Sequence, residues 1–382
     1  CDLITHFDAS KFKTRFACEV KNFNVENFMD RKEARKLDKY AQFALVAADE
    51  AVKDSGLELN KIDLDEAGVI WASGIGGIQT FQEEVISFSK GDGTPRFSPF
   101  FIPKMIADIA AGHISMKYGF RGPNFCTVSA CASSSHAISE ACTQIRLGKA
   151  KIMITGGSEA AIMEAGVGGF NAMQALSTNN DEYKTASRPF CKTRDGFVMG
   201  EGAAGLILEE YEHAVARGAK IYTEIIGTGL TADAYHLTAP HPEGLGAKKV
   251  MEMALKEAEL EPNKVDYINV HGTATPLGDI AELKAIQAVF GEHAYKLNIS
   301  STKSMHGHLL GGAGAVEAVA SILAMVHNTI PPTINHKEQD ENIDPKLNLT
   351  LHKAQERTVN YALSNTFGFG GHNACILFKK LA

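Results

Sequence analysis

Apolar residues along the chain follow two kinds of spacing. Short continuous apolar runs predict buried strands at residues 67–73, 125–128, 152–154, 205–208, 222–227, 265–270 and 374–378. Helical spacing predicts helices at residues 31–54, 103–118, 247–260 and about 308–326, and one more that follows Cys131 and stops at Gly148. Because strands alternate with helices, the pattern predicts an α/β fold.

The length of the chain favours two units. Its 382 residues exceed the size at which one core usually stops growing. After Arg217-Gly218-Ala219 the alternation of strands and helices begins again. We therefore expect two halves, residues 1–219 and 220–382. Gly156-Gly157 predicts a turn after strand 152–154, and residues 365–371 predict a loop.

Cys131 is the first candidate for chemistry. It lies among small residues, between a predicted strand and the first turn of a predicted helix. A helix N-terminus favours a thiolate, so the pKa of this thiol is expected to fall from about 8.5 toward neutrality. The alternative is that Cys131 is a buried small apolar side chain, as most free cysteines are.

A histidine stands in the matching place of the second half. His271 follows strand 265–270, just as Cys131 follows its own strand. Open α/β sheets bind ligands at the carboxyl ends of their strands, so the two halves are expected to share one site. A histidine at the end of a strand can also be purely structural, and that reading stays open here.

Composition excludes several classes of protein. A formal net charge of −7 does not indicate a nucleic-acid or anionic-membrane surface, and no wholly apolar run approaches the length of a membrane span. The seven scattered cysteines form no zinc-ligand pattern, so we expect no metal and a reducing, cytoplasmic setting. Gly74-Ile75-Gly76-Gly77 fails the dinucleotide fingerprint because position 79 is Gln79, which argues against a nicotinamide oxidoreductase.

Three motifs carry a resemblance to a known family. They are Ser129-Ala130-Cys131, Val270-His271-Gly272-Thr273-Ala274-Thr275-Pro276 and Lys303-Ser304-Met305-His306-Gly307-His308. Together with the loop Asn365-Thr366-Phe367-Gly368-Phe369-Gly370-Gly371, they make the whole chain resemble the β-ketoacyl-acyl carrier protein synthases of the thiolase superfamily. The resemblance implies a thiolase-like fold, in which two pseudo-duplicated α/β halves form a five-layered αβαβα core.

The resemblance also implies roles for residues. Cys131 would accept the acyl group, His271 and His308 would complete a Cys-His-His triad, and Lys303 with Glu317 would support them. The backbone N–H groups of Cys131 and Phe369 would form the oxyanion hole. Thr273 and Thr275 would contact pantetheine, and an acyl tunnel would be lined by Phe197, Ile75, Phe367 and Phe369, with Ile75 and Phe369 as gates. His306 would lie outside the triad.

The implied reaction is the elongating condensation of type II fatty acid synthesis. A thiolate would hold the acyl chain as a thioester, and decarboxylation of malonyl-acyl carrier protein would supply the carbanion. Two neutral imidazoles would donate hydrogen bonds to the developing enolate oxygen. The partners would be acyl- and malonyl-acyl carrier protein and a second copy of the chain, with no cofactor.

Some alternatives remain. Arg31, Lys32, Arg35 and Lys36 could dock an acidic carrier protein or form an ordinary solvated face. The enzyme could use coenzyme A instead, although the basic cluster and the second histidine argue against that. The chain could be a non-catalytic subunit that sets chain length, but such subunits lack the cysteine. Two departures from the family stand out: its usual first strand would precede Cys1, and His372 replaces the threonine of many relatives.

Overall fold

Two mixed sheets form the frame of the molecule. The computed structural model describes residues 1–381. The first sheet has the order β4-β3-β5-β6, and the second has the order β7-β13-β12-β8-β9. Their strands are β3 (Ala67–Ala72), β4 (Asn124–Thr127), β5 (Ile152–Glu159), β6 (Gly202–Glu209), β7 (Thr223–Ala232), β8 (Tyr267–Asn269), β9 (Asn298–Ser300), β12 (Tyr361–Gly368) and β13 (His372–Lys380).

The two sheets repeat one topology, as expected for two pseudo-duplicated halves. In the first, β4, β3 and β5 are parallel and β6 is antiparallel to β5. In the second, β9, β8 and β12 are parallel and β13 is antiparallel to β12. Strand β7 adds a fifth member beside β13, and among the described residues no strand holds the matching position beside β6.

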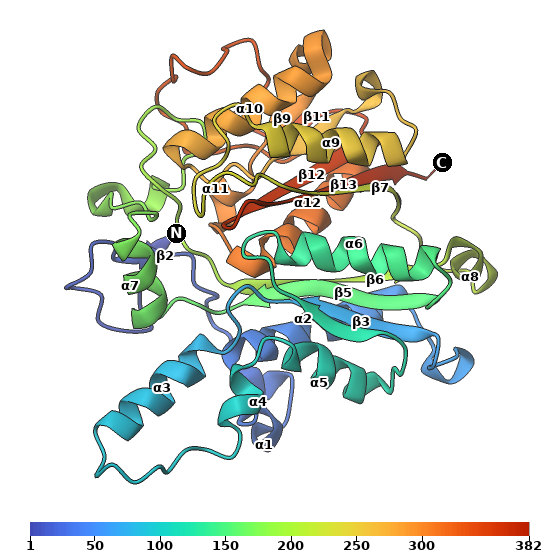
Figure 1. Ribbon diagram of the computed structural model, residues 1–382. Helices are drawn as coiled ribbons and strands as arrows, with labels where there is room; N and C mark the ends of the chain where they lie inside the picture. The colour runs from blue at the N-terminus through green and yellow to red at the C-terminus, as the bar shows by residue number, and fades with distance from the viewer. Residues whose placement is uncertain (382) are drawn as a thin grey trace.

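Helices complete five layers. α6 (Ser133–Arg146) and α12 (Ala313–His327) lie between the sheets, α2 (Lys39–Ser55) and α5 (Ile109–Tyr118) cover the first sheet, and α9 (Leu245–Glu257) and α10 (Pro276–Phe290) cover the second (Figure 1). The order αβαβα agrees with the expected fold. The remaining helices are α1 (Arg31–Ala34), α3 (Ile78–Ser89), α4 (Phe101–Met105), α7 (Glu164–Ala172), α8 (Tyr211–Ala216) and α11 (Lys303–His306).

Short elements fill the connections. Two-residue strands pair as β1 (Asp2–Leu3) with β2 (Phe16–Ala17) and as β10 (Thr329–Ile330) with β11 (Gln355–Glu356). Short 3₁₀ helices are η1 (Val25–Asn27), η2 (Leu59–Lys61), η3 (Asn180–Thr185), η4 (Pro262–Lys264), η5 (Gly291–Tyr295) and η6 (Leu310–Gly312).

Capping residues divide the first predicted helix. Residues 31–54 were expected to form one helix, but Asp30 and Asp38 each accept a backbone N–H two residues later, so they start α1 and α2 separately. Gly56, with φ of 64°, then ends α2. The helix expected at 103–118 is likewise split, because the extended backbone of Ile106 separates α4 from α5.

Two glycine-rich stretches differ from the expected turns. Strand β5 continues through Gly156 and Gly157. At Gly156 a Cβ atom would lie only 2.1 Å from the carbonyl oxygen of Ala204 on β6, so a residue with a side chain would not fit there. The glycine therefore permits close strand pairing and makes no turn. The expected loop 365–371 is also shorter, because β12 pairs with β13 as far as Gly368.

The central helix α12 is strongly apolar. Together with η6 it spans Leu310–His327, the one 18-residue segment of residues 1–381 that is long and apolar enough to cross a membrane, with a mean hydropathy of 1.5. It is mostly buried, and it carries the fully buried Glu317. This is the environment of a core helix between two sheets.

Candidate active site

A tight turn between β4 and α6 presents Cys131. Ala130 has a φ of +50°, a conformation that side chains other than glycine rarely adopt. Ser133 holds the turn, because its hydroxyl donates to the carbonyl of Ala130 at 2.6 Å and accepts the N–H of Ser129 at 2.9 Å. The turn leaves the sulfur at the N-terminal end of α6, with the side chain only 7% exposed.

Both predicted histidines lie beside this sulfur. His308 Nε2 is 2.9 Å from Cys131 Sγ, across the boundary between the halves. The rings of His271 and His308 meet edge to face, with centroids 5.3 Å apart. The structure therefore brings together the three side chains that the sequence motifs singled out.

The loop after β12 reaches the same sulfur. The backbone N–H of Phe369 faces Cys131 and acts to lower the pKa of its thiol. A Cβ at Gly368 would lie 3.1 Å from the backbone nitrogen of Cys131, so only glycine lets β12 approach this turn so closely. The backbone segment that carries Phe369 therefore lies against the Cys131 turn, and the oxyanion hole formed by the two N–H groups stays a prediction.

A cavity of about 460 Å³ opens onto the three side chains. Of the residues expected to bind substrate, Thr273, Thr275, Phe197, Phe367 and Phe369 line it. The Phe197 ring also packs edge to face on His308, with centroids 5.1 Å apart. The lining combines threonine hydroxyl groups with aromatic rings, which suits a ligand that has both polar and apolar parts.

Comparison with known proteins now places this arrangement in a family. A model of the β-ketoacyl synthase N-terminal domain matches residues 4–214, and a model of the C-terminal domain matches residues 222–337. The chain belongs to the β-ketoacyl synthase family.

Individual relatives agree with that result. Two curated proteins named 3-oxoacyl-[acyl-carrier-protein] synthase 2 are similar over 99% of this chain, one from Synechocystis sp. (50% identical, 90% of its length covered) and one from Staphylococcus aureus (49% identical, 91% covered). A solved β-ketoacyl synthase from Burkholderia phymatum superposes with a TM-score of 0.91 at 35% identity, covering 98% of this chain and 91% of that one. A polyketide ketosynthase solved with its acyl-carrier protein superposes with a TM-score of 0.90 at 34% identity, covering 98% and 90%.

Electrostatics at the site of this β-ketoacyl synthase differ from the expectation for Cys131. Burial raises the pKa of the Cys131 thiol to about 12, although the charge of Lys303 and the N–H of Phe369 act in the opposite direction. The expected fall of this pKa toward neutrality is therefore wrong, because loss of water outweighs the helix N-terminus. Burial thus favours the neutral forms of both the thiol and the neighbouring imidazole.

The two histidines are held in their neutral forms. Burial, followed by the positive charge of Lys303, lowers the pKa of both His271 and His308 well below 6.5. The Nδ1 atoms of both rings are buried without a hydrogen-bond partner among residues 1–381, so no carboxylate stabilises an imidazolium there. Neutral imidazoles can donate an N–H to an anionic oxygen without readily surrendering a proton to it.

Lys303 and Glu317 form a buried ion pair that connects α11 to α12. Their side chains are 1% and 0% exposed, and Lys303 Nζ bonds to Glu317 Oε1. Burial raises the pKa of Glu317 to about 7, against the opposing charge of Lys303. Neither residue lines the cavity, so the pair acts on the histidines through its field and its packing.

The sequence analysis missed two carboxylates on α10. Glu282 accepts the backbone N–H groups of His271 and Gly272, both at 2.9 Å. Asp279 accepts those of Phe190 and Ala274, at 2.8 and 3.1 Å. These bonds hold the turn that carries His271. The only signal in the sequence was a pair of acidic residues three positions apart in a mostly apolar helix, a spacing that is also common on exposed faces.

Three predicted features lie away from the cavity. Ile75 is 38% exposed in the turn after β3 and does not line the cavity of this chain, so its role in acyl binding stays a prediction. His306 bonds to Thr302 and Gly307, outside the triad as expected. The basic side chains of α1 and its C-terminal end are mostly exposed; they are Arg31, Lys32, Arg35 and Lys36.

A metal centre was not expected. Among residues 1–381, no group of three or more His, Cys, Asp or Glu side chains has a geometry that could hold a metal ion.

Proposed function

We propose that this β-ketoacyl synthase elongates acyl chains by decarboxylative condensation of malonyl-acyl carrier protein with an acyl group held on Cys131. The observation that carries the proposal is the convergence of the Cys131 sulfur, two neutral imidazoles and the Phe369 N–H at one cavity. The names of its relatives, 3-oxoacyl-[acyl-carrier-protein] synthase 2, support the same reaction.

Acyl transfer is the first half-reaction. The Cys131 sulfur attacks the carbonyl of the acyl carrier thioester, and the N–H groups of Cys131 and Phe369 bind the oxyanion that forms. The C–S bond of the incoming thioester breaks, and the carrier thiol leaves with the proton that Cys131 gave up. A thioester is exchanged for a thioester, so the acyl group stays activated.

Condensation is the second half-reaction. Malonyl carrier protein loses carbon dioxide, and its thioester oxygen takes the negative charge between His271 and His308. Two donors at about 3 kcal/mol each would supply about four orders of magnitude in rate. The enolate carbon then attacks the acyl carbonyl on Cys131, and the bond to sulfur breaks with its electron pair on Cys131. The resulting thiolate takes up one proton from solvent to restore the thiol, and a 3-oxoacyl chain two carbons longer leaves on the carrier.

Mass spectrometry tests the first half-reaction. After incubation with an acyl carrier thioester, the protein is expected to gain one acyl group per chain, located on Cys131 by peptide mapping. The Cys131→Ala variant is the control and should gain none. Absence of acylation in the unmodified protein would contradict the proposal and favour a non-catalytic subunit that sets chain length.

We propose that the basic cluster of α1 docks the carrier protein. Arg31 and Arg35 border a groove of about 590 Å³ that Lys39 and Lys104 also line. These four exposed or partly exposed cations outnumber the three carboxylates of the groove, which are Glu26, Asp38 and Glu83. The excess of positive charge suits an acidic partner and speeds its association. The same cluster favours a carrier protein over coenzyme A as the substrate carrier. A protein needs a docking surface outside the cavity, whereas a small substrate does not.

Charge reversal tests the docking surface. The double variant Arg31→Glu/Arg35→Glu is expected to raise KM for carrier-bound substrates about tenfold, with kcat within about twofold, because rim charges act mainly on association. Lys61→Glu, an exposed cation outside the groove, is the control. The effect should shrink as salt rises. An unchanged KM at low salt would contradict the assignment.

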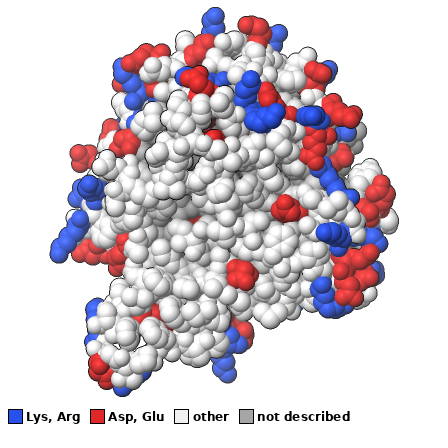
Figure 2. All heavy atoms as spheres, viewed as in Figure 1, with Lys and Arg blue, Asp and Glu red and all other residues white. Residues whose placement is uncertain are grey.

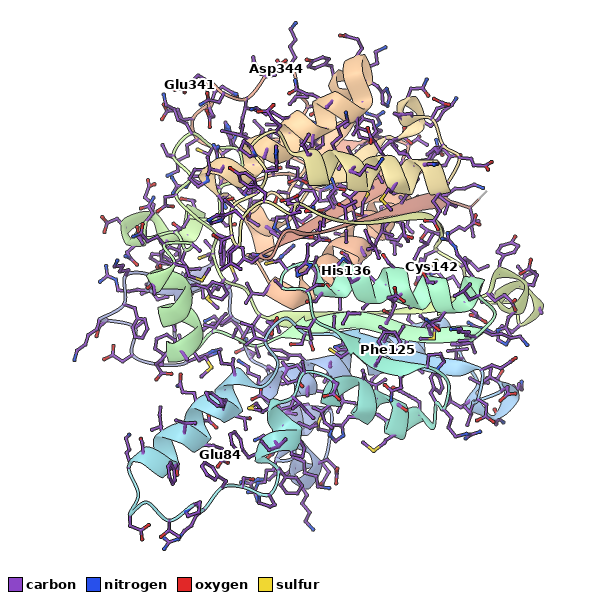
Figure 3. All side chains as sticks on the ribbon, viewed as in Figure 1. Glu84, Phe125, His136, Cys142, Glu341 and Asp344 are labelled. Atoms are coloured by element: carbon purple, nitrogen blue, oxygen red, sulfur yellow. The ribbon has the colours of Figure 1, made fainter. Side chains whose placement is uncertain are left out.

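We propose that the protein works as a homodimer in the cytoplasm. Strand β4 is an edge strand, and Phe125 on it is 38% exposed, with Val128 just beyond it at 60%. Figure 2 shows few charged side chains over the middle of this face, and Figure 3 shows Phe125 on the outer edge of the first sheet. An unpaired edge with apolar side chains favours pairing with a second copy. Exposed Ile75 would then lie near an interface.

A further inference from the structure

Glu159, the last residue of β5, is a fully buried carboxylate that the reaction described above does not use. Its two oxygens accept four hydrogen bonds. Oε2 accepts the backbone N–H groups of Gly74 at 2.8 Å and Gly311 at 2.9 Å. Oε1 accepts the hydroxyl of Ser73 at 2.9 Å and the N–H of Ile75 at 3.2 Å.

These bonds join segments from both halves of the chain. Gly74 belongs to the turn after β3, whereas Gly311 lies in η6, three residues after His308. The backbones are in direct contact, because a Cβ at Gly311 would lie 2.1 Å from the nitrogen of Gly74. A Cβ at Gly74 would lie 3.4 Å from the carbonyl oxygen of Ala130, which precedes Cys131. The carboxylate therefore sits beside the nucleophile turn.

The segment that follows His308 needs such an anchor. Leu310 has a φ of +49°, an uncommon conformation that persists only where surrounding contacts enforce it. His308 itself is paired on one side only, where its N–H donates to Val198 at 2.7 Å and its carbonyl accepts the N–H of Gly200 at 2.8 Å. Glu159 fixes the other side through Gly311.

We propose that Glu159 is a positioning residue, whose carboxylate holds the segment after His308 against the Cys131 turn and so keeps the His308 imidazole at hydrogen-bond distance from the sulfur. The expected effect of Glu159 on the rate of condensation rests on the proposed function. Its expected effect on the reactivity of the Cys131 thiol does not, because any reagent that alkylates thiols can measure that reactivity.

Removal of the carboxylate has two opposing effects on Cys131. Glu159→Gln takes away a negative charge that raises the pKa of the Cys131 thiol, so this effect alone speeds alkylation. The amide also places an NH₂ group against donors that lose their acceptor, which loosens the anchor. Loss of the His308 contact withdraws the proton acceptor of the thiol, so the second effect slows alkylation. Only this second effect requires His308.

A double-mutant cycle separates the two effects. The rate of Cys131 alkylation by iodoacetamide is measured in the unmodified protein, Glu159→Gln, His308→Ala and the double variant. All four are measured at one pH well above 7, so that the carboxyl group is ionised, because burial raises the pKa of Glu159 to about 7. We expect Glu159→Gln to slow alkylation when His308 is present and to leave it unchanged or faster in the His308→Ala background. The two fold-changes should differ by about fivefold or more, as for residues that share one network. Equal fold-changes in both backgrounds would overturn the proposal.

Turnover gives a second reading. In Glu159→Gln, kcat for condensation is expected to fall about tenfold or more with KM within about threefold, the signature of a group that acts on the transition state. An unchanged kcat would overturn the role in turnover. If the unmodified protein itself fails to condense, the proposed function fails, whereas the alkylation cycle still decides the role of Glu159.

Two further variants guard against a simple loss of folding. Glu209→Gln removes a carboxylate at the opposite end of the same sheet, where it bonds to Arg217, and should not change the alkylation rate. If Glu159→Gln does not fold, Ser73→Ala removes one of the four bonds and leaves the charge. It should still give a difference of about twofold between the two His308 backgrounds, and equal fold-changes would again overturn the proposal.

Discussion

Cys131→Gln is expected to abolish condensation while malonyl decarboxylation continues. The variant cannot hold an acyl thioester, so condensation should fall by about four orders of magnitude or more. The two imidazoles that receive the enolate charge remain in place, and the glutamine amide can accept the hydrogen bonds of the Cys131 and Phe369 N–H groups. Release of carbon dioxide from malonyl carrier protein, measured without an acyl donor, should stay at or above the rate of the unmodified protein.

His308→Ala is the matched comparison. It removes one of the two N–H donors of the enolate oxygen, so decarboxylation should fall about 10²–10³-fold. Cys131 remains able to accept an acyl group, although more slowly without the imidazole 2.9 Å from its sulfur. If Cys131→Gln lost decarboxylation as completely as His308→Ala, the division of labour between the sulfur and the imidazoles would be wrong.

Part of the site could be predicted from the local sequence. Cys131 and His271 each follow a predicted strand, and the rule that strand ends of an α/β sheet gather ligands predicted that they share one site. His308 follows the short helix α11 and no strand, so its role was predicted only from the resemblance to a family. The pKa of Cys131 could not be predicted in this way, because it depends on burial and on groups far away in the chain, such as the charge of Lys303 and the backbone N–H of Phe369.

The roles of the two carboxylates Glu159 and Glu282 could not be predicted from the sequence for the same reason. Glu159 and Glu282 act by accepting backbone N–H groups, and a backbone N–H leaves no trace in a sequence. What the sequence shows is a charged residue at the end of a strand or on a helix, which is ordinary at a surface. Only the arrangement of β3, β5, α10 and η6 in space reveals that these carboxylates are buried.

Fold prediction failed mainly where glycine had two possible meanings. Gly156 and Gly157 indicated a turn, yet they let β5 and β6 pair closely. The glycines near residue 370 led to an expected loop that included half of β12. A glycine can mark a turn or a close approach between backbones, and the sequence does not distinguish these without knowing the neighbouring strand.

Lys303→Met is expected to impair both stability and chemistry. It leaves Glu317 buried without a counter-charge, which costs about 3–5 kcal/mol in the free energy of unfolding. Burial is the largest cause that lowers the pKa of His271 and His308, and the charge of Lys303 is the next. Removal of Lys303 therefore raises the pKa of both histidines. When the pH is lowered, the imidazoles of the variant therefore become protonated at a higher pH than those of the unmodified protein. The acid limb of the plot of decarboxylation rate against pH should move to higher pH. Alkylation of Cys131 should slow, because Lys303 also lowers the pKa of this thiol.

The double variant Lys303→Met/Glu317→Leu separates electrostatics from packing. Replacing both members of a buried ion pair by apolar side chains of similar volume is often neutral for stability, so the melting temperature should recover most of what Lys303→Met lost. The field of Lys303 remains absent, so the acid limb should stay above that of the unmodified protein and alkylation should stay slow. Recovery of the original pH profile together with the melting temperature would instead show that Lys303 acts only through packing. Since neither side chain lines the cavity, no loss of substrate contact complicates this comparison.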